Sequence, residues 1–217
     1  GSWAVYLEKG GKLTMEDQSG IENSQYVGNN SSNGSLPGLS GSTGGINVKD
    51  DGSGVDMYDT SYVKAPGRYG IGIYGRSSIS ENSMVTLNDA SLIKECSIGV
   101  YMSGTNSIIA MHDKSMLLEN KDQAIYASSV SGGSRIYMDG EAEIRGKNRS
   151  GNGIYLNSIT GSSDNLKIDL DDKAAITQTG YAVYNASSYN MIYTDLNMHG
   201  DSRISKNTYG VYYGYNS

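Results

Sequence analysis

The 217-residue chain lacks phenylalanine and contains only one cysteine, one tryptophan and two prolines. The single cysteine, Cys96, cannot form a disulfide within the chain, so no internal disulfide framework is available to it. No run approaches the roughly 18 apolar residues that cross a membrane as a helix, so we expect no transmembrane segment here. Basic side chains number 17 against 23 acidic ones, and the net charge of −6 argues against nucleic-acid binding, which requires clustered lysine and arginine.

Glycine and tyrosine, by contrast, are abundant, with 29 and 18 residues. Hydrophobic residues make up 37 % of the chain, which is low for a conventional core, but their regular placement argues against disorder. The length fits one domain or one segment of a longer solenoid. Because the chain opens with Gly1-Ser2 and has neither an initiator methionine nor a signal peptide, we expect residues 1–217 to be a single segment cut from a longer polypeptide.

An internal repeat organises the chain. Six segments align without a gap: LTMEDQSGI (13–21), VTLNDASLI (85–93), IAMHDKSML (109–117), IYMDGEAEI (136–144), IDLDDKAAI (168–176) and LNMHGDSRI (196–204). An aliphatic residue followed two places later by methionine or leucine predicts a short strand with these side chains on one face. The aspartate or glycine two places further on predicts a tight bend, and the last aliphatic position predicts a second short strand.

A third element, a GIY, GVY, AIY or AVY tripeptide, recurs with the same period. Successive tyrosines of this element, from Tyr74 to Tyr212, lie 25 to 29 residues apart, and the tripeptide at Tyr6 opens the chain in the same way. The region around Ile46, Val48 and Asp50 fits the template more loosely, and only the first coil lacks a good third strand. A lone coil buries too little apolar surface to fold, so the coils must stack through parallel hydrogen bonds. The repeat therefore predicts an all-β, single-stranded parallel β-helix (β-solenoid) of about seven coils of ~28 residues, with almost no helix.

The combination of Ile-x-Met/Leu-x-Asp/Gly bends, GIY-type third strands and a single cysteine resembles the pertactin-like passenger domains of bacterial autotransporters. The resemblance is one of repeat pattern and covers nearly the whole chain. It implies a right-handed parallel β-helix, displayed on or released from a cell surface, for adhesion or host interaction. Neither a GxSxG serine-protease signature nor an RGD tripeptide occurs in the chain. The resemblance therefore implies a scaffold and a general role, and it assigns no functional residue.

The tyrosines of the third strands are the first candidate for a binding surface. The Ile or Val before each tyrosine is expected to face inward, so each tyrosine should face outward and form an exposed ladder. Such a ladder offers stacking surface for glycans or a protein interface. The alternative is that like residues stack only to stabilise the sheet. The partner-binding candidates are Tyr74, Tyr101, Tyr126, Tyr155, Tyr184 and Tyr212.

Two further surface features are candidates. Arg145, Lys147 and Arg149 alternate along one short stretch, so they are expected to point outward and form a positive patch for a sulfated glycan or an acidic receptor. The alternative is a set of solvated turn charges. Residues 28–45, rich in glycine, serine and asparagine, predict a protruding loop, either functional or simply disordered. A second insertion is expected around Lys64 to Tyr69.

The sequence offers little for metal binding or catalysis. His112 and His199 share an outward column but lie three coils apart, so they cannot bind one metal ion. Aspartates near Gly52 and Gly54 match no complete calcium loop. A polysaccharide lyase or glycosidase would need clustered carboxylates. The candidates for that chemistry are Asp139, Asp169, Asp171, Asp172 and Lys173, but aspartate is expected at these bends for turn geometry alone.

We therefore expect a non-catalytic bacterial cell-surface (outer membrane, exported) or secreted passenger, an adhesin or virulence factor. Its expected partner is a host cell-surface protein, matrix component or glycan. We expect a monomer with no catalytic residue, cofactor or metal site. The alternatives are a β-helical polysaccharide lyase or glycoside hydrolase, and a structural stalk.

Overall fold

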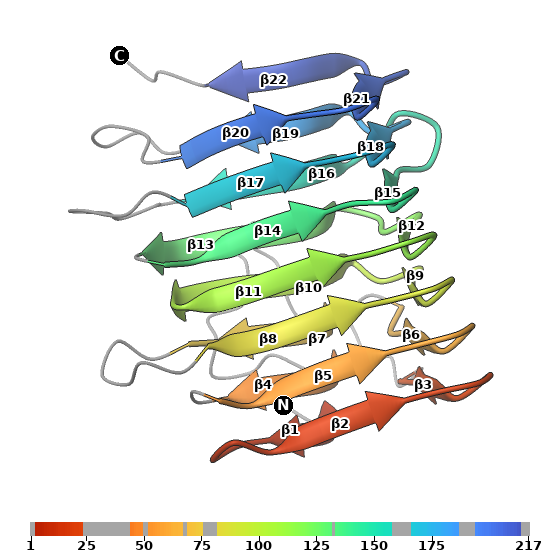
Figure 1. The fold of residues 1–217 in the computed structure, drawn as a ribbon, viewed down its shortest axis with the longest axis vertical. Helices are drawn as coiled ribbons and strands as arrows, with labels where there is room; N and C mark the ends of the chain where they lie inside the picture. The colour runs from red at the N-terminus through yellow and green to blue at the C-terminus, as the bar shows by residue number, and fades with distance from the viewer. Residues whose placement is uncertain are drawn as a thin grey trace, which may run out of the picture.

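The computed structural model describes residues 3–23, 44–49, 52–66, 69–75, 82–131, 133–157, 166–186 and 194–213. These residues form three parallel sheets and contain no helix. The strands stack along the long axis of the molecule, from β1 near the N-terminus to β22 near the C-terminus (Figure 1). The prediction of an all-β parallel β-solenoid is thus confirmed.

Each turn of the chain contributes one strand to each of three sheets, here named A, B and C. Sheet A contains β1 (Trp3–Leu7), β4 (Gly44–Lys49), β7 (Tyr69–Tyr74), β10 (Ile98–Thr105), β13 (Gln123–Ser131), β16 (Asn152–Asn157), β19 (Tyr181–Asn185) and β22 (Tyr209–Tyr213). Sheet B contains β2 (Lys12–Met15), β5 (Gly54–Met57), β8 (Ser83–Leu87), β11 (Ser107–Met111), β14 (Arg135–Met138), β17 (Leu166–Leu170) and β20 (Thr194–Met198). Sheet C contains β3 (Gly20–Glu22), β6 (Tyr62–Lys64), β9 (Leu92–Lys94), β12 (Met116–Leu118), β15 (Glu143–Arg145), β18 (Ala175–Thr177) and β21 (Arg203–Ser205).

The coil is right-handed. In Figure 1 the strands of sheet B point to the right in front, those of sheet A point to the left behind them, and the chain climbs from N to C. Seven successive triplets of strands are followed by one further strand, β22. The stack therefore comprises seven three-strand coils and the first strand of an eighth, which differs slightly from the predicted seven.

The aliphatic columns of the repeat line the interior, as predicted. Ile109 pairs in register with Val85 and Ile136, and Ile125 pairs with Val100 and Ile154. All of these side chains are fully buried in one continuous core cluster. Because every inward residue packs on its counterparts one coil above and below, the core runs the length of the stack. This rigid interior fixes the direction of every outward side chain.

Aspartate holds the bend between sheets B and C, and its role explains the Asp or Gly column. Asp17, Asp59 and Asp89 have φ values of 56°, 54° and 54°, a left-handed conformation that asparagine, aspartate and glycine tolerate best. The Asp59 carboxylate accepts a hydrogen bond from the Asp17 N–H at 3.0 Å, and the Asp89 carboxylate accepts one from the Asp59 N–H at 3.0 Å. Asp59 and Asp89 thus each form their own turn and tie it to the coil before it.

The coil between residues 44 and 64 corrects the sequence alignment. Ile46 and Val48 lie in β4 of sheet A, so they form the third strand that the first coil was expected to lack. The first strand of the next coil is β5, where Val55 pairs with Leu13 and Met57 with Met15. Most of the predicted 28–45 loop lies outside the described residues, and Gly44 and Gly45 belong to β4. In the second expected insertion, residues 67 and 68 also lie outside them.

Candidate functional site

The tyrosines of sheet A form a ladder, with one change of register. Tyr101, Tyr126, Tyr155, Tyr184 and Tyr212 are in-register neighbours on five successive strands. Their ring centroids are 5.6, 5.2, 5.3 and 5.2 Å apart in that order. These separations are those of stacked or tilted aromatic pairs. The predicted outward ladder is therefore continuous over these coils.

Tyr74 does not occupy the tyrosine column, which corrects the alignment of the GIY tripeptide at this coil. Gly72, two residues earlier, pairs with Tyr101, and Tyr74 pairs with Ser103. The space above Gly72 is filled by Trp3 and Tyr74, because a Cβ at Gly72 would lie 2.8 Å from the Trp3 ring and 2.9 Å from the Tyr74 ring. The Tyr74 ring still lies 5.4 Å from that of Tyr101, so it joins the ladder from a neighbouring column.

A second outward column widens the ladder into an aromatic surface that the sequence analysis missed. Tyr69 stacks on Tyr101 at 5.4 Å, and Tyr181 stacks on Tyr209 at 4.6 Å and lies 4.8 Å from Tyr184. The sequence does indicate this second column in the YAVY (181–184) and YGVY (209–212) segments, where another tyrosine lies three residues before the tyrosine of the tripeptide. We call the following set the tyrosine array: Trp3, Tyr69, Tyr74, Tyr101, Tyr126, Tyr155, Tyr181, Tyr184, Tyr209 and Tyr212.

The middle of the tyrosine array is buried, so the prediction of a uniformly exposed ladder is wrong. Tyr101 and Tyr126 are only 4 % and 5 % exposed and form a small apolar cluster with Ile98. The Tyr126 ring forms tilted pairs with Tyr101 and Tyr155, and the Tyr126 hydroxyl accepts a hydrogen bond from the Asn157 amide at 2.9 Å. Burial raises the pKa of Tyr101 above its ordinary value. At these coils the array acts as a second, outer core.

The C-terminal part of the tyrosine array is open. Tyr155, Tyr181 and Tyr184 are half-buried, and Tyr209 and Tyr212 are 54 % and 44 % exposed. The last two lie on β22, the end strand of sheet A, where the inward-facing Val211 is also exposed. The Tyr184 and Tyr212 rings are nearly parallel, at 3°. Stacked rings held by a rigid sheet lose little conformational entropy when a ligand packs on them, which suits a contact surface.

The predicted positive patch does not stand as a set of free cations. Arg145 lies 3.6 Å from Glu143, and Lys147 lies 3.5 Å from Glu119 on the coil before. Arg149 is exposed and makes no ion pair among the described residues. The three side chains lie on or beside one extended turn, residues 146–151, between sheets C and A. Their positive charge is therefore partly neutralised.

A polar network on the outer face of sheet B was not foreseen. The Asp139 carboxylate lies 2.8 Å from His112 Nδ1, and its hydrogen bond with Tyr137 raises the pKa of that phenol to about 12. On the next coil the nearly buried Asp169 accepts hydrogen bonds from Arg135 Nε at 2.7 Å and from the Asn197 amide at 2.8 Å. The sequence analysis named His112 and Asp139 separately and did not predict their contact.

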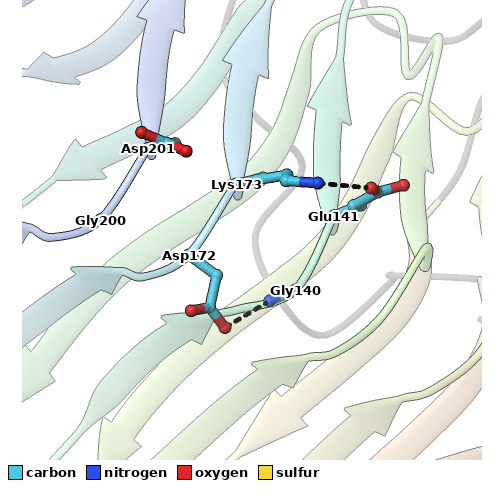
Figure 2. Close-up of a pocket in the computed structure, with 6 residues that line it drawn as sticks. All are labelled: Gly140, Glu141, Asp172, Lys173, Gly200 and Asp201. Carbon is cyan, nitrogen blue, oxygen red and sulfur yellow. Dashed lines mark hydrogen bonds and ion pairs between the residues drawn. The ribbon is translucent and has the colours of Figure 1, made fainter.

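Asp172, another carboxylate considered for catalysis, has a structural partner. A pocket of about 400 Å³ lies at the bend between sheets B and C, and Figure 2 shows the residues that line it. The Asp172 carboxylate accepts a hydrogen bond there from the Gly140 N–H at 3.3 Å. Lys173 extends towards Glu141, with Nζ 3.3 Å from the carboxylate, and Asp201 stands apart from this pair. These charges hold adjacent coils together and do not converge on one point.

Metal binding finds no support in the described residues, which contain no group of three or more His, Cys, Asp or Glu side chains able to bind one ion. Asp50 and Asp51 lie outside them. Within the same ranges no helix is long and apolar enough to cross a membrane.

No family model, curated protein or solved structure matches the chain. The geometry of the surface is therefore the basis for a functional proposal.

Proposed function

We propose that the chain is a β-helical segment of an exported bacterial surface or secreted protein, and that it binds a host-cell protein or glycan without catalysis. The observation that carries this proposal is the open C-terminal part of the tyrosine array. Tyrosine supplies a large contact area with a polar tip and is enriched among the residues that dominate binding energy. The open rings lie next to one another on three adjacent strands, β16, β19 and β22.

The burial pattern divides the tyrosine array into two roles. Tyr101 and Tyr126 have too little exposed surface for a partner to contact, so their role is to stabilise sheet A. Tyr209 and Tyr212 are about half exposed to solvent. We therefore restrict the proposed contact surface to Tyr155, Tyr181, Tyr184, Tyr209 and Tyr212.

The resemblance to autotransporter passengers supports export. The repeat pattern is that of a parallel β-helix, and the chain contains a single cysteine, whose side chain is buried. A chain that crosses a membrane unfolded gains from having no disulfides to form early. A rod with one uniform core and side chains that differ from coil to coil on its outside can present many small contacts along its length.

The test is binding of the purified chain to cultured mammalian epithelial cells and to a glycan array. The double variant Tyr209→Ala/Tyr212→Ala should weaken binding at least about tenfold, as expected for truncating two dominant contacts. The matched control is Tyr58→Ala, because Tyr58 is a comparably exposed tyrosine, at 38 %, that follows β5 outside the tyrosine array. Circular dichroism checks that both variants fold.

Two results would overturn this function. If the double variant folds and binds as tightly as the wild-type chain, the tyrosine array is not the contact surface. If the wild-type chain binds neither the cells nor any glycan, the chain is better described as a structural stalk.

A polysaccharide-cleaving enzyme is the second candidate, and the network around His112 favours it. The Asp139 carboxylate lies 2.8 Å from His112 Nδ1 and so orients the imidazole, and a histidine oriented by a carboxylate is a common arrangement for general acid–base catalysis. Cleavage of an acidic polysaccharide panel, lost in His112→Ala and kept in His199→Ala, would support this function. Absence of products across the panel would exclude it in favour of binding.

A further inference from the structure

The corner between sheets C and A contains a second pocket, distinct from the tyrosine array. Its volume is about 560 Å³, and its lining includes Pro66, Glu95, Glu119, Lys121, Lys147 and Ser150. These residues come from four successive coils, because Pro66 follows β6, Glu95 follows β9, Glu119 and Lys121 follow β12, and the other two follow β15. The pocket therefore depends on the stacking of coils and is absent from any single one.

The extended turn at residues 146–151 forms one wall of this pocket. Six residues separate β15 from β16, whereas three separate β9 from β10. Asn148, Arg149 and Gly151 have φ values of 54°, 60° and 68°, so the turn is held in a left-handed conformation. The N–H groups of Gly146 and Arg149 donate to the carbonyl groups of Thr177 and Gln178 on the next coil, at 2.9 Å each. This wall is thus anchored to the stack.

The charges around the pocket leave an excess of cations. The Glu95 carboxylate lies 2.7 Å from Lys64 Nζ, and this contact, helped by Lys94 and Lys147, lowers the pKa of Glu95. The Glu119 carboxylate lies 3.5 Å from Lys147 Nζ. Lys121 is exposed and makes no ion pair with any described residue. Both anions of the lining are therefore compensated, while Lys121 has no compensating anion in the described part of the chain.

We propose that this corner pocket binds a sulfate group of a sulfated glycan. Lys121 and Lys147 supply ammonium groups, with Lys147 shared with Glu119. The Ser150 hydroxyl donates to the Lys147 carbonyl at 2.6 Å and so closes the turn that carries Lys147. A glycan fits better than a free ion because the pocket is far larger than one sulfate group, and Pro66 gives it an apolar wall for a sugar ring. The proposed site specifies sulfated glycans as the ligand class within the proposed recognition of host glycans, and this inference rests on that proposed function.

The experiment measures binding of a heparin-derived oligosaccharide, its desulfated counterpart and inorganic sulfate by calorimetry at two salt concentrations. Wild-type protein should bind the sulfated oligosaccharide, bind the desulfated one at least about tenfold more weakly, and lose affinity as salt rises. Lys121→Gln should weaken binding about tenfold. Glu119→Gln should tighten it several-fold, because it frees Lys147 and removes an anion. Lys114→Gln is the matched control, since Lys114 is an exposed lysine of the same coil at the opposite bend.

Equal binding of both oligosaccharides, or equal effects of Lys121→Gln and Lys114→Gln, would overturn the site. Inorganic sulfate bound as tightly as the oligosaccharide would overturn the glycan assignment. Failure of the corner pocket is distinguishable from failure of the proposed function. If cells still bind through Tyr209 and Tyr212 while the oligosaccharide does not bind, only the pocket proposal is wrong.

Discussion

Replacing Tyr126 by alanine should destabilise the protein strongly, although tyrosine at an outward position of a strand would ordinarily be expendable. The side chain is 5 % exposed, and its ring lies 5.6 Å from that of Tyr101 and 5.2 Å from that of Tyr155. Two aromatic pairs contribute about 0.5–1.5 kcal/mol each beyond burial. Truncation of a buried aromatic side chain to alanine costs about 3–5 kcal/mol in total, and we expect a loss in that range.

Tyr126→Phe and Tyr58→Ala separate the contributions to this loss. Tyr126→Phe removes only the hydroxyl that accepts from Asn157, so it should cost about 1 kcal/mol. Tyr58→Ala removes a partly exposed ring outside the tyrosine array and should cost about 0.5 kcal/mol. Urea unfolding followed by circular dichroism gives the free energies, provided the slopes of the variants agree. A Tyr126→Ala loss no larger than that of Tyr58→Ala would refute the view that the middle of the tyrosine array is an outer core.

Three further changes test the corners and the interior. Asp89→Ala should lower the free energy of unfolding in urea by about 1–2 kcal/mol, because it removes the acceptor for the Asp59 N–H and places alanine at a φ of 54°. Asp89→Asn should cost less, because asparagine tolerates this φ. Equal losses would show that aspartate is not needed for this turn. Ser91→Ala should leave stability unchanged or raise it by up to about 1 kcal/mol, since the fully buried Ser91 hydroxyl has no hydrogen-bond partner among the described residues. A loss of stability above about 1 kcal/mol would show that the hydroxyl does have a hydrogen-bond partner. Burial raises the pKa of the Cys96 thiol to about 12, so native protein at pH 8 should resist a thiol reagent until urea unfolds it. The stability that the neutral thiol contributes should fall as pH rises from about 9 towards 12, because the thiol ionises first in the unfolded chain. Rapid labelling of folded protein would contradict this burial.

The scaffold was predictable because its determinants are periodic. Inward positions such as Ile109 and Ile144 require apolar side chains in every coil, and the left-handed bend requires aspartate or glycine at positions such as Asp113. Both requirements repeat along the chain and are visible without coordinates. The coil of β5 and β6 followed the same rule through Val55, Met57 and Val63, and its segment VDMYDTSYV could have been aligned with the other six.

The candidate sites were less predictable because they depend on contacts between coils. Whether an outward tyrosine is exposed depends on the rings above and below it, and Tyr126 and Tyr212 share one column but differ in exposure from 5 % to 44 %. Gly72 occupies the tyrosine column in place of Tyr74, and the Trp3 ring, more than sixty positions away in the sequence, lies over it. The corner pocket likewise arises from side chains of four coils. None of these contacts between coils repeats at a regular spacing in the sequence, so the repeat pattern does not reveal them.

Hydroxyl-radical footprinting with mass spectrometry tests most directly whether the tyrosine array is closed in its middle and open towards its C-terminal coils. We expect fast oxidation of Tyr58, Tyr209 and Tyr212 in the folded protein and strong protection of Tyr101 and Tyr126, with the difference abolished in urea. Oxidation of Tyr101 and Tyr126 at the rate of Tyr212 in folded protein would contradict it.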